Sequence, residues 1–183
     1  RWFLSQPLQF SKGHAFMSNT DCEAVIHAYE ESGEECVKKF NGMWAFAIYN
    51  RDTKQIFISR DRFGKKPFFY TLQQGVFAFA SELTALISHQ LIDRSISDIA
   101  VKKYFAYGYI PSPHTIYKNI FKLPGGHNLV LNVDDLNFRI TKYWDFVLEE
   151  PDSMPHDPEE SWGEEIRYLL DKAVKRRLLS DVP

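Results

Sequence analysis

Apolar residues recur with helical spacing near the beginning of the chain, between residues 20 and 40. Thr20 and Glu23 have the spacing of a capping box, in which each side chain bonds an amide at the helix start. Gly33 suits a helix C-terminus, because glycine readily adopts the left-handed conformation found there. The pattern therefore predicts one helix from the Thr20 cap to Gly33 and a second, short helix over 34–40.

The apolar period changes to two after residue 42. Apolar runs separated by short polar turns predict strands at 43–49, 55–59, 67–72, 76–80, 127–133 and 139–144. Turns this short join neighbouring strands as antiparallel hairpins. Two further helices are expected over 82–88 and 97–107. The pattern alone thus indicates an α+β protein with antiparallel sheet.

The last part of the chain differs in composition from the rest. The stretch 149–158 is acidic and holds three prolines, which makes it the best linker candidate. Ser161 and Glu164 repeat the capping-box spacing and predict the start of a last helix. The apolar positions of that helix form a one-sided stripe of Ile166, Leu169, Leu170, Ala173, Val174 and Leu178. The sequence therefore predicts that another domain begins after the linker.

Charge and cysteine content exclude several classes of protein. Lys and Arg number 22 and Asp and Glu 24, so the net charge is −2, which argues against a dedicated nucleic-acid surface. No apolar run approaches the roughly 18 residues of a membrane span. Cys22 and Cys36 are too few for a disulfide framework and favour a reducing compartment. We therefore expect a cytoplasmic protein with neither nucleic acid nor membrane as a partner.

A set of local motifs occurs in a fixed order along nearly the whole chain. They read TDCE (20–23), NGMWAFA (41–47), RDRFGKKPFFY (60–70), FASE (79–82), YIPSPHTIY (109–117), KLPGGH (122–127), YWD (143–145) and RLLSDVP (177–183). This ordered set resembles the class II glutamine amidotransferases, and specifically the asparagine synthetase (glutamine-hydrolysing) family. One position departs from the family pattern, since Gly125 replaces its second proline and is expected to loosen that loop.

The resemblance implies a fold and a division into domains. It implies an N-terminal-nucleophile αββα sandwich, here partial, with two stacked antiparallel sheets between helix layers. Residues 1–146 would be the C-terminal part of the amidotransferase domain, 147–158 a linker, and 159–183 the first helix of an α/β ATP-pyrophosphatase synthetase domain. Both ends of the chain look cut, because the family's nucleophilic cysteine and its ATP pyrophosphate loop would lie outside Arg1–Pro183.

The resemblance also implies an activity for the parent protein, a ligase. Glutamine is hydrolysed to ammonia, and the ammonia reacts with aspartate activated by ATP to give asparagine. ATP and Mg²⁺ are implied for the full-length protein, with no cofactor in this chain, which is expected to be inactive alone. Two alternatives stay open: a class II amidotransferase with another acceptor, such as a polymer or an antibiotic, and a non-catalytic glutamine-binding module. A homodimer is compatible with the sequence.

Asp21 is the one residue to which the resemblance gives a role, binding the α-ammonium of glutamine. A fixed carboxylate suits a cation, because it gives a charge-assisted hydrogen bond. The alternative is that Asp21 only complements the positive end of a helix dipole. No catalytic residue is predicted, because Cys22 is internal and lacks the free α-amine that assists an N-terminal nucleophile. Cys36, among apolar residues, is expected to be structural.

The remaining candidates for chemistry favour structural roles. The charge run 60–62 is interpreted as an ion-paired corner in which Gly64 supplies an unusual backbone angle, in preference to a site for an acidic substrate. His114 and His127 lack the spacing of metal ligands, and the other histidines are equally isolated in sequence. The sequence therefore predicts no metal site.

Overall fold

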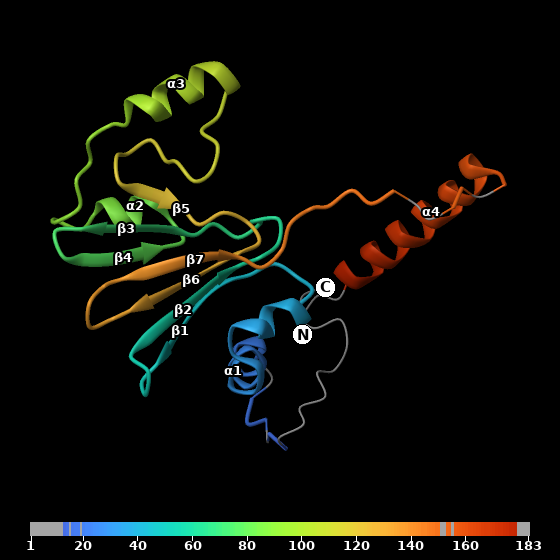
Figure 1. The fold of residues 1–183 in the computed structure, drawn as a ribbon, viewed down its shortest axis with the longest axis horizontal. Coiled ribbons are helices and arrows are strands. Elements are labelled where there is room, and N and C mark those ends of the chain that lie inside the picture. Colours follow the sequence, from blue (N-terminus) through green and yellow to red (C-terminus); the bar gives the residue numbers. More distant parts are fainter. Residues whose placement is uncertain (1–12, 15, 19, 151–152, 155, 179–183) are drawn as a thin grey trace. The chain divides into compact units, whose positions relative to one another are not determined.

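The computed structural model describes residues 13–14, 16–18, 20–150, 153–154 and 156–178 (Figure 1). They form two compact units, the first ending at Asp145 and the second beginning at Phe146. None of the helices in this part of the chain has the length and apolar character that a membrane crossing needs.

The first unit contains two antiparallel sheets. The four-stranded sheet has the order β1-β2-β6-β7, with β1 Ala45–Asn50, β2 Gln55–Arg60, β6 His127–Asn132 and β7 Phe138–Lys142. The three-stranded sheet has the order β4-β3-β5, with β3 Phe69–Gln73, β4 Val76–Ala80 and β5 Ile120–Lys122. The predicted hairpins β1–β2, β3–β4 and β6–β7 are confirmed. The three-residue strand β5 was not predicted.

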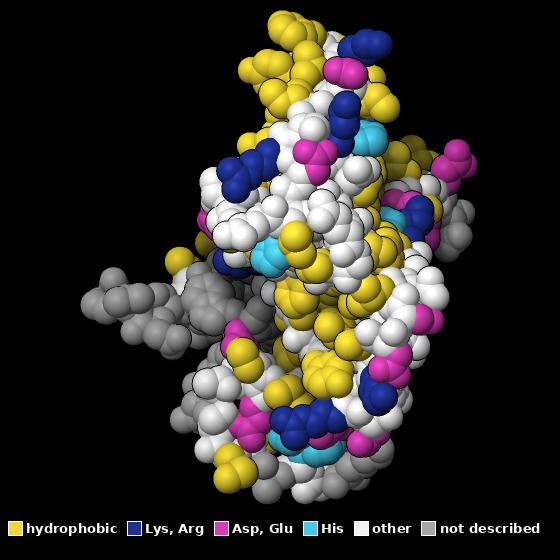
Figure 2. Space-filling model, turned by 90° about the vertical axis from the view of Figure 1, so that its left-hand side faces the viewer, with side chains coloured by type: hydrophobic (Ala, Val, Ile, Leu, Met, Phe, Trp, Pro, Cys, Tyr) yellow, Lys and Arg dark blue, Asp and Glu magenta, His cyan; other side chains and the backbone are white. Residues whose placement is uncertain are grey.

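Helices accompany both sheets in this unit. They are α1 Asp21–Ser32, the 3₁₀ helix η1 Gly33–Lys39, α2 Leu83–Ile87 and α3 Asp98–Tyr107. The prediction of a second short helix after Gly33 is confirmed in place, although its turns are 3₁₀. Several apolar side chains of α3 are exposed, Phe105 most of all, and they contribute to the hydrophobic patch at the α3 end of the molecule in Figure 2.

Alternating side chains divide the core of the first unit into three layers. Ile58 of β2 and Leu129 of β6 lie opposite each other and pack between the two sheets against Tyr70 of β3. Their neighbours Phe57 and Val130 point to the other face of the sheet, because successive residues of a strand face opposite sides.

Each outer sheet face is covered by helical residues. Phe57 and Val130 pack against α1 and η1 through Val25 and Val37. On the far side of the smaller sheet, a third cluster is built from Leu86, Ile92 and Ile120, which brings α2 against β5 and its neighbours. The layers therefore run helix, sheet, sheet, helix, as expected for an αββα sandwich.

The second unit holds α4, Pro158–Arg177. Its N-cap is Asp157, whose side chain accepts a hydrogen bond from the Glu160 amide, so the predicted cap at Ser161 is wrong. Proline at the first helical position fits this earlier start, because an N–H at that position would have no hydrogen-bond acceptor within the helix. The predicted apolar stripe is exposed at Ile166, Leu169, Leu170, Val174 and Leu178.

Candidate functional site

Asp21 is the first residue of α1, and its side chain is half-buried. The predicted N-cap, Thr20, has an extended backbone but makes no capping hydrogen bond with its side chain. Glu23 reaches past Thr20 and accepts bonds from the amides of Met17, at 2.6 Å, and Ser18, at 2.7 Å. The predicted capping box is therefore wrong. Glu23 bonds the amides of Met17 and Ser18 instead of the Thr20 amide, because the segment before the helix places those two amides within its reach.

The start of α1 concentrates negative charge. Hydrogen bonds from the Ser18 hydroxyl and the Met17 amide favour the carboxylate of Glu23 and lower its pKa to about 2. Asp21 lies in the same first turn, where the helix dipole also favours an anion. Two acidic side chains therefore lie in the first turn of α1.

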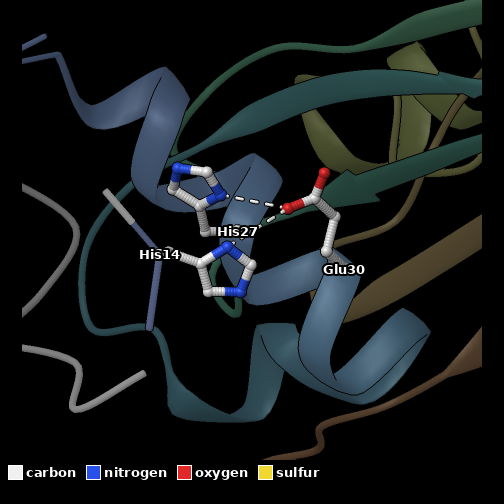
Figure 3. Close-up of side chains that lie close together, drawn as sticks. All are labelled: His14, His27 and Glu30. Carbon is white, nitrogen blue, oxygen red and sulfur yellow. Dashed lines mark hydrogen bonds and ion pairs between the residues drawn. The ribbon is translucent and has the colours of Figure 1, made fainter. Parts of the chain in front are cut away.

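Two histidines and a glutamate meet beside the middle of this helix (Figure 3). The rings of His14 and His27 lie 4.3 Å apart between centroids. Glu30 Oε2 is 3.0 Å from His27 Nδ1 and 3.6 Å from His14 Nδ1. His14 and His27 are isolated in sequence but meet in space, because the segment that carries His14 folds back over α1. Only the three-residue spacing of His27 and Glu30 signalled part of this cluster.

The two cysteines lie in contrasting surroundings. Cys36 is fully buried in the core between η1 and the larger sheet, and burial raises the pKa of its thiol to about 12. This confirms the prediction of a structural cysteine. Cys22 is exposed in the first turn of α1, next to Asp21.

The corner after β2 is built around backbone hydrogen bonds. Asp61 is 1% exposed, and its carboxylate accepts bonds from the amides of Trp44, Lys65 and Lys66 at 3.3, 2.9 and 3.0 Å. Gly64 has the positive φ, +62°, that the sequence predicted. The corner is therefore structural, as expected, but amides replace the predicted ion pair as partners of Asp61.

Arg60 holds the other side of the same corner. Its guanidinium donates to the carbonyls of Gly64, at 2.6 Å, Lys66, at 2.7 Å, and Leu123. Three backbone acceptors engage this cation, which supports a structural role over binding of an acidic substrate.

Two antiparallel sheets stacked between helix layers define the αββα class of α+β proteins, to which the N-terminal-nucleophile amidotransferases belong. Residues 4–144 match the glutamine amidotransferase domain family, and the chain belongs to that family. The expectation drawn from the ordered motifs is thereby confirmed at the level of the family.

Most of the chain is similar in sequence to a part of longer proteins. A Methanocaldococcus jannaschii protein, provisionally named asparagine synthetase (glutamine-hydrolysing) 2, is 44% identical over 91% of this chain and 32% of its own length. Asparagine synthetase (glutamine-hydrolysing) 3 of Bacillus subtilis is 35% identical over 94% of this chain and 27% of its own length. The chain thus spans about a third or less of these relatives.

A solved structure gives a weaker similarity. The glutamine phosphoribosylpyrophosphate amidotransferase of B. subtilis, complexed with ADP and GMP, is 16% identical, with a TM-score of 0.47 over 74% of this chain and 25% of that chain. The family assignment rests on the domain match.

Proposed function

We propose that this chain is the glutamine-binding part of a glutamine-dependent asparagine synthetase, and that Asp21 binds the α-ammonium group of glutamine. The family match supports glutamine as the substrate, and the names of the relatives at 44% and 35% identity support asparagine as the product. The observation that carries the proposal is the position of Asp21, half-buried in the first turn of α1 within the matched domain.

The proposed chemistry has two stages. The thiolate of an N-terminal cysteine attacks the side-chain amide carbon of glutamine, the C–N bond breaks as ammonia leaves, and water hydrolyses the thioester to glutamate. The ammonia then attacks the β-acyl adenylate of aspartate, and AMP leaves as asparagine forms. ATP and Mg²⁺ belong to the second stage, and we assign none of the described residues to them.

Asp21 acts in the first stage by holding glutamine in place. Its carboxylate accepts hydrogen bonds from the α-ammonium group and thereby fixes the position of the side-chain amide relative to the nucleophile. The hydrogen bonds of Glu23 to Met17 and Ser18 hold the segment before Asp21 against the helix. The helix start that carries the Asp21 carboxylate is therefore already in place before glutamine binds.

The substitution Asp21→Asn in the full-length protein tests this role. A hydrogen bond to a charged group contributes about 1.5–3 kcal/mol, so we expect KM for glutamine to rise about 10- to 100-fold. Synthesis of asparagine from free ammonia should be unchanged, because it does not require glutamine. The measurement is steady-state kinetics with each nitrogen source in turn.

Asp52→Asn is the matched control, because Asp52 is an exposed residue of the β1–β2 turn. An unchanged KM for glutamine in Asp21→Asn would contradict the role of Asp21. Hydrolysis of glutamine without asparagine formation would contradict the acceptor and favour an amidotransferase for a polymer or an antibiotic. Glutamine binding without hydrolysis would instead identify a non-catalytic binding module.

A further inference from the structure

The cluster of His14, His27 and Glu30 has the composition of a site for a transition metal. Two imidazoles and a carboxylate each offer one ligand atom, and these three atoms lie within 4.8 Å of one another. Figure 3 shows the two rings and the carboxylate converging on a common region. His27 and Glu30 are three residues apart on α1, which places them on one face of the helix.

The distances in the cluster suit zinc. With Zn–N and Zn–O bonds near 2.0–2.1 Å and tetrahedral angles, two ligand atoms of one zinc ion lie about 3.3 Å apart. The Glu30 Oε2 atom lies 3.0 Å from His27 Nδ1 and 3.6 Å from His14 Nδ1, on either side of that value. Two of the three distances between ligand atoms therefore lie close to those of a zinc site, and the third is at most 4.8 Å.

Both imidazoles also face a second carboxylate with their other nitrogen. His27 Nε2 lies 3.6 Å from Glu23 Oε1, and His14 Nε2 lies 3.9 Å from Glu31 Oε1. Metal-binding histidines commonly have a carboxylate beside the nitrogen that does not bind the metal, because this fixes the ring and makes the ligating nitrogen more basic. In the cluster these two carboxylates lie just beyond hydrogen-bond distance of the histidine nitrogens, close enough to take that role when a metal is bound.

We propose that His14, His27 and Glu30 bind a divalent transition-metal ion, with zinc as the best fit and water as the fourth ligand. The bound ion would link the segment before α1 to the middle of the helix and so fix the segment that leads to Asp21. This inference does not depend on the proposed reaction, and neither its support nor its test involves glutamine.

Titration of the metal-free full chain with Co²⁺ tests the site, because four-coordinate Co²⁺ has an intense visible absorption. The Cys22→Ser background is used, since an exposed thiol on the same helix is itself a metal ligand. We expect a 1:1 complex with that spectrum, displacement of Co²⁺ by Zn²⁺, and a Zn²⁺-dependent rise in Tm.

Variants distinguish this site from incidental binding. His14→Gln, His27→Gln and Glu30→Gln should each weaken Co²⁺ binding at least 100-fold, and Glu31→Gln about 10-fold. His89→Gln is the control, because His89 is exposed and outside the cluster. Circular dichroism of each metal-free variant checks that it is folded. Absence of the absorption in the parent chain, or equal weakening by His89→Gln, would overturn the proposal.

Discussion

Two acidic residues in one helical turn have different environments. Glu23 has its oxygens engaged by the amides of Met17 and Ser18 and by the Ser18 hydroxyl. Asp21, two positions earlier, begins the helix, and the resemblance gives it the role of binding an ammonium group. We infer that Glu23 stabilises the helix start and that the role of Asp21 there is to bind the ligand.

The pH dependence of stability tests the role of Glu23. Its pKa is lowered from 4.5 to about 2 in the folded chain. A lowered pKa stabilises the fold above pH 4.5, and this stabilisation is lost as the pH falls from 4.5 towards 2. We therefore expect Glu23→Gln to have a lower free energy of unfolding than the parent above pH 4.5, with the difference shrinking towards pH 2.

Urea unfolding at a series of pH values measures this difference. Glu149→Gln is the matched control, because Glu149 is exposed and lies outside the helix. A difference between Glu23→Gln and the parent that stayed constant from pH 6 to pH 2 would show that the ionised carboxylate does not hold the segment before α1.

At the scale of elements, the sequence predicted the strands and helix starts that are determined by residues close together in the chain. The period-two runs located β4 without error and β2 and β6 to within one residue, because each strand buries alternate side chains on two faces. The strand β5 has only three residues, too few for a period to be recognised. Asp21 was placed correctly at a helix start, but the meeting of His14 with His27 depends on a fold-back that no local pattern encodes.

The turn between β5 and β6 is hydrogen-bonded to the segments that follow β2 and β7. The amide of Gly126 donates to the carbonyl of Asp61 at 2.9 Å, and its carbonyl accepts from the amides of Tyr143 and Trp144. A Cβ at Gly125 would lie 2.7 Å from the Gly64 nitrogen. The glycine that replaces the family's proline therefore allows close packing of backbones, which argues against the predicted loosening of the loop.

Substitution of Gly126 by alanine tests this packing. Gly126 has φ +68°, and a Cβ there would lie 2.4 Å from the Trp144 carbonyl oxygen. Gly75 is the matched control, with φ +72° and no atom within 4 Å of its Cβ position. We expect Gly75→Ala to cost about 1–2 kcal/mol from backbone strain alone, and Gly126→Ala at least about 2 kcal/mol more. Chemical denaturation measures both, and equal costs would contradict the close approach.

At the scale of the whole first unit, the two sheets are joined by side chains, since their strands lie in separate hydrogen-bonded sets. Ile58 and Leu129 from the larger sheet and Leu123 beside the smaller one are completely buried in this shared core. The stability of each sheet should therefore depend on the same few residues.

Leu129→Ala tests that dependence across the fold. Removing a fully buried leucine costs about 2–5 kcal/mol, and a loss of 3 kcal/mol corresponds to about a 100-fold faster hydrogen exchange of amides that open by global unfolding. Because Leu129 packs between the sheets, protected amides of β2 and β3 should accelerate by the same factor. Leu72→Ala, at a position 40% exposed on β3, should change both far less. If Leu129→Ala accelerated exchange in β2 and left β3 unchanged, the sheets would unfold independently, and the layer between them would not be a common core.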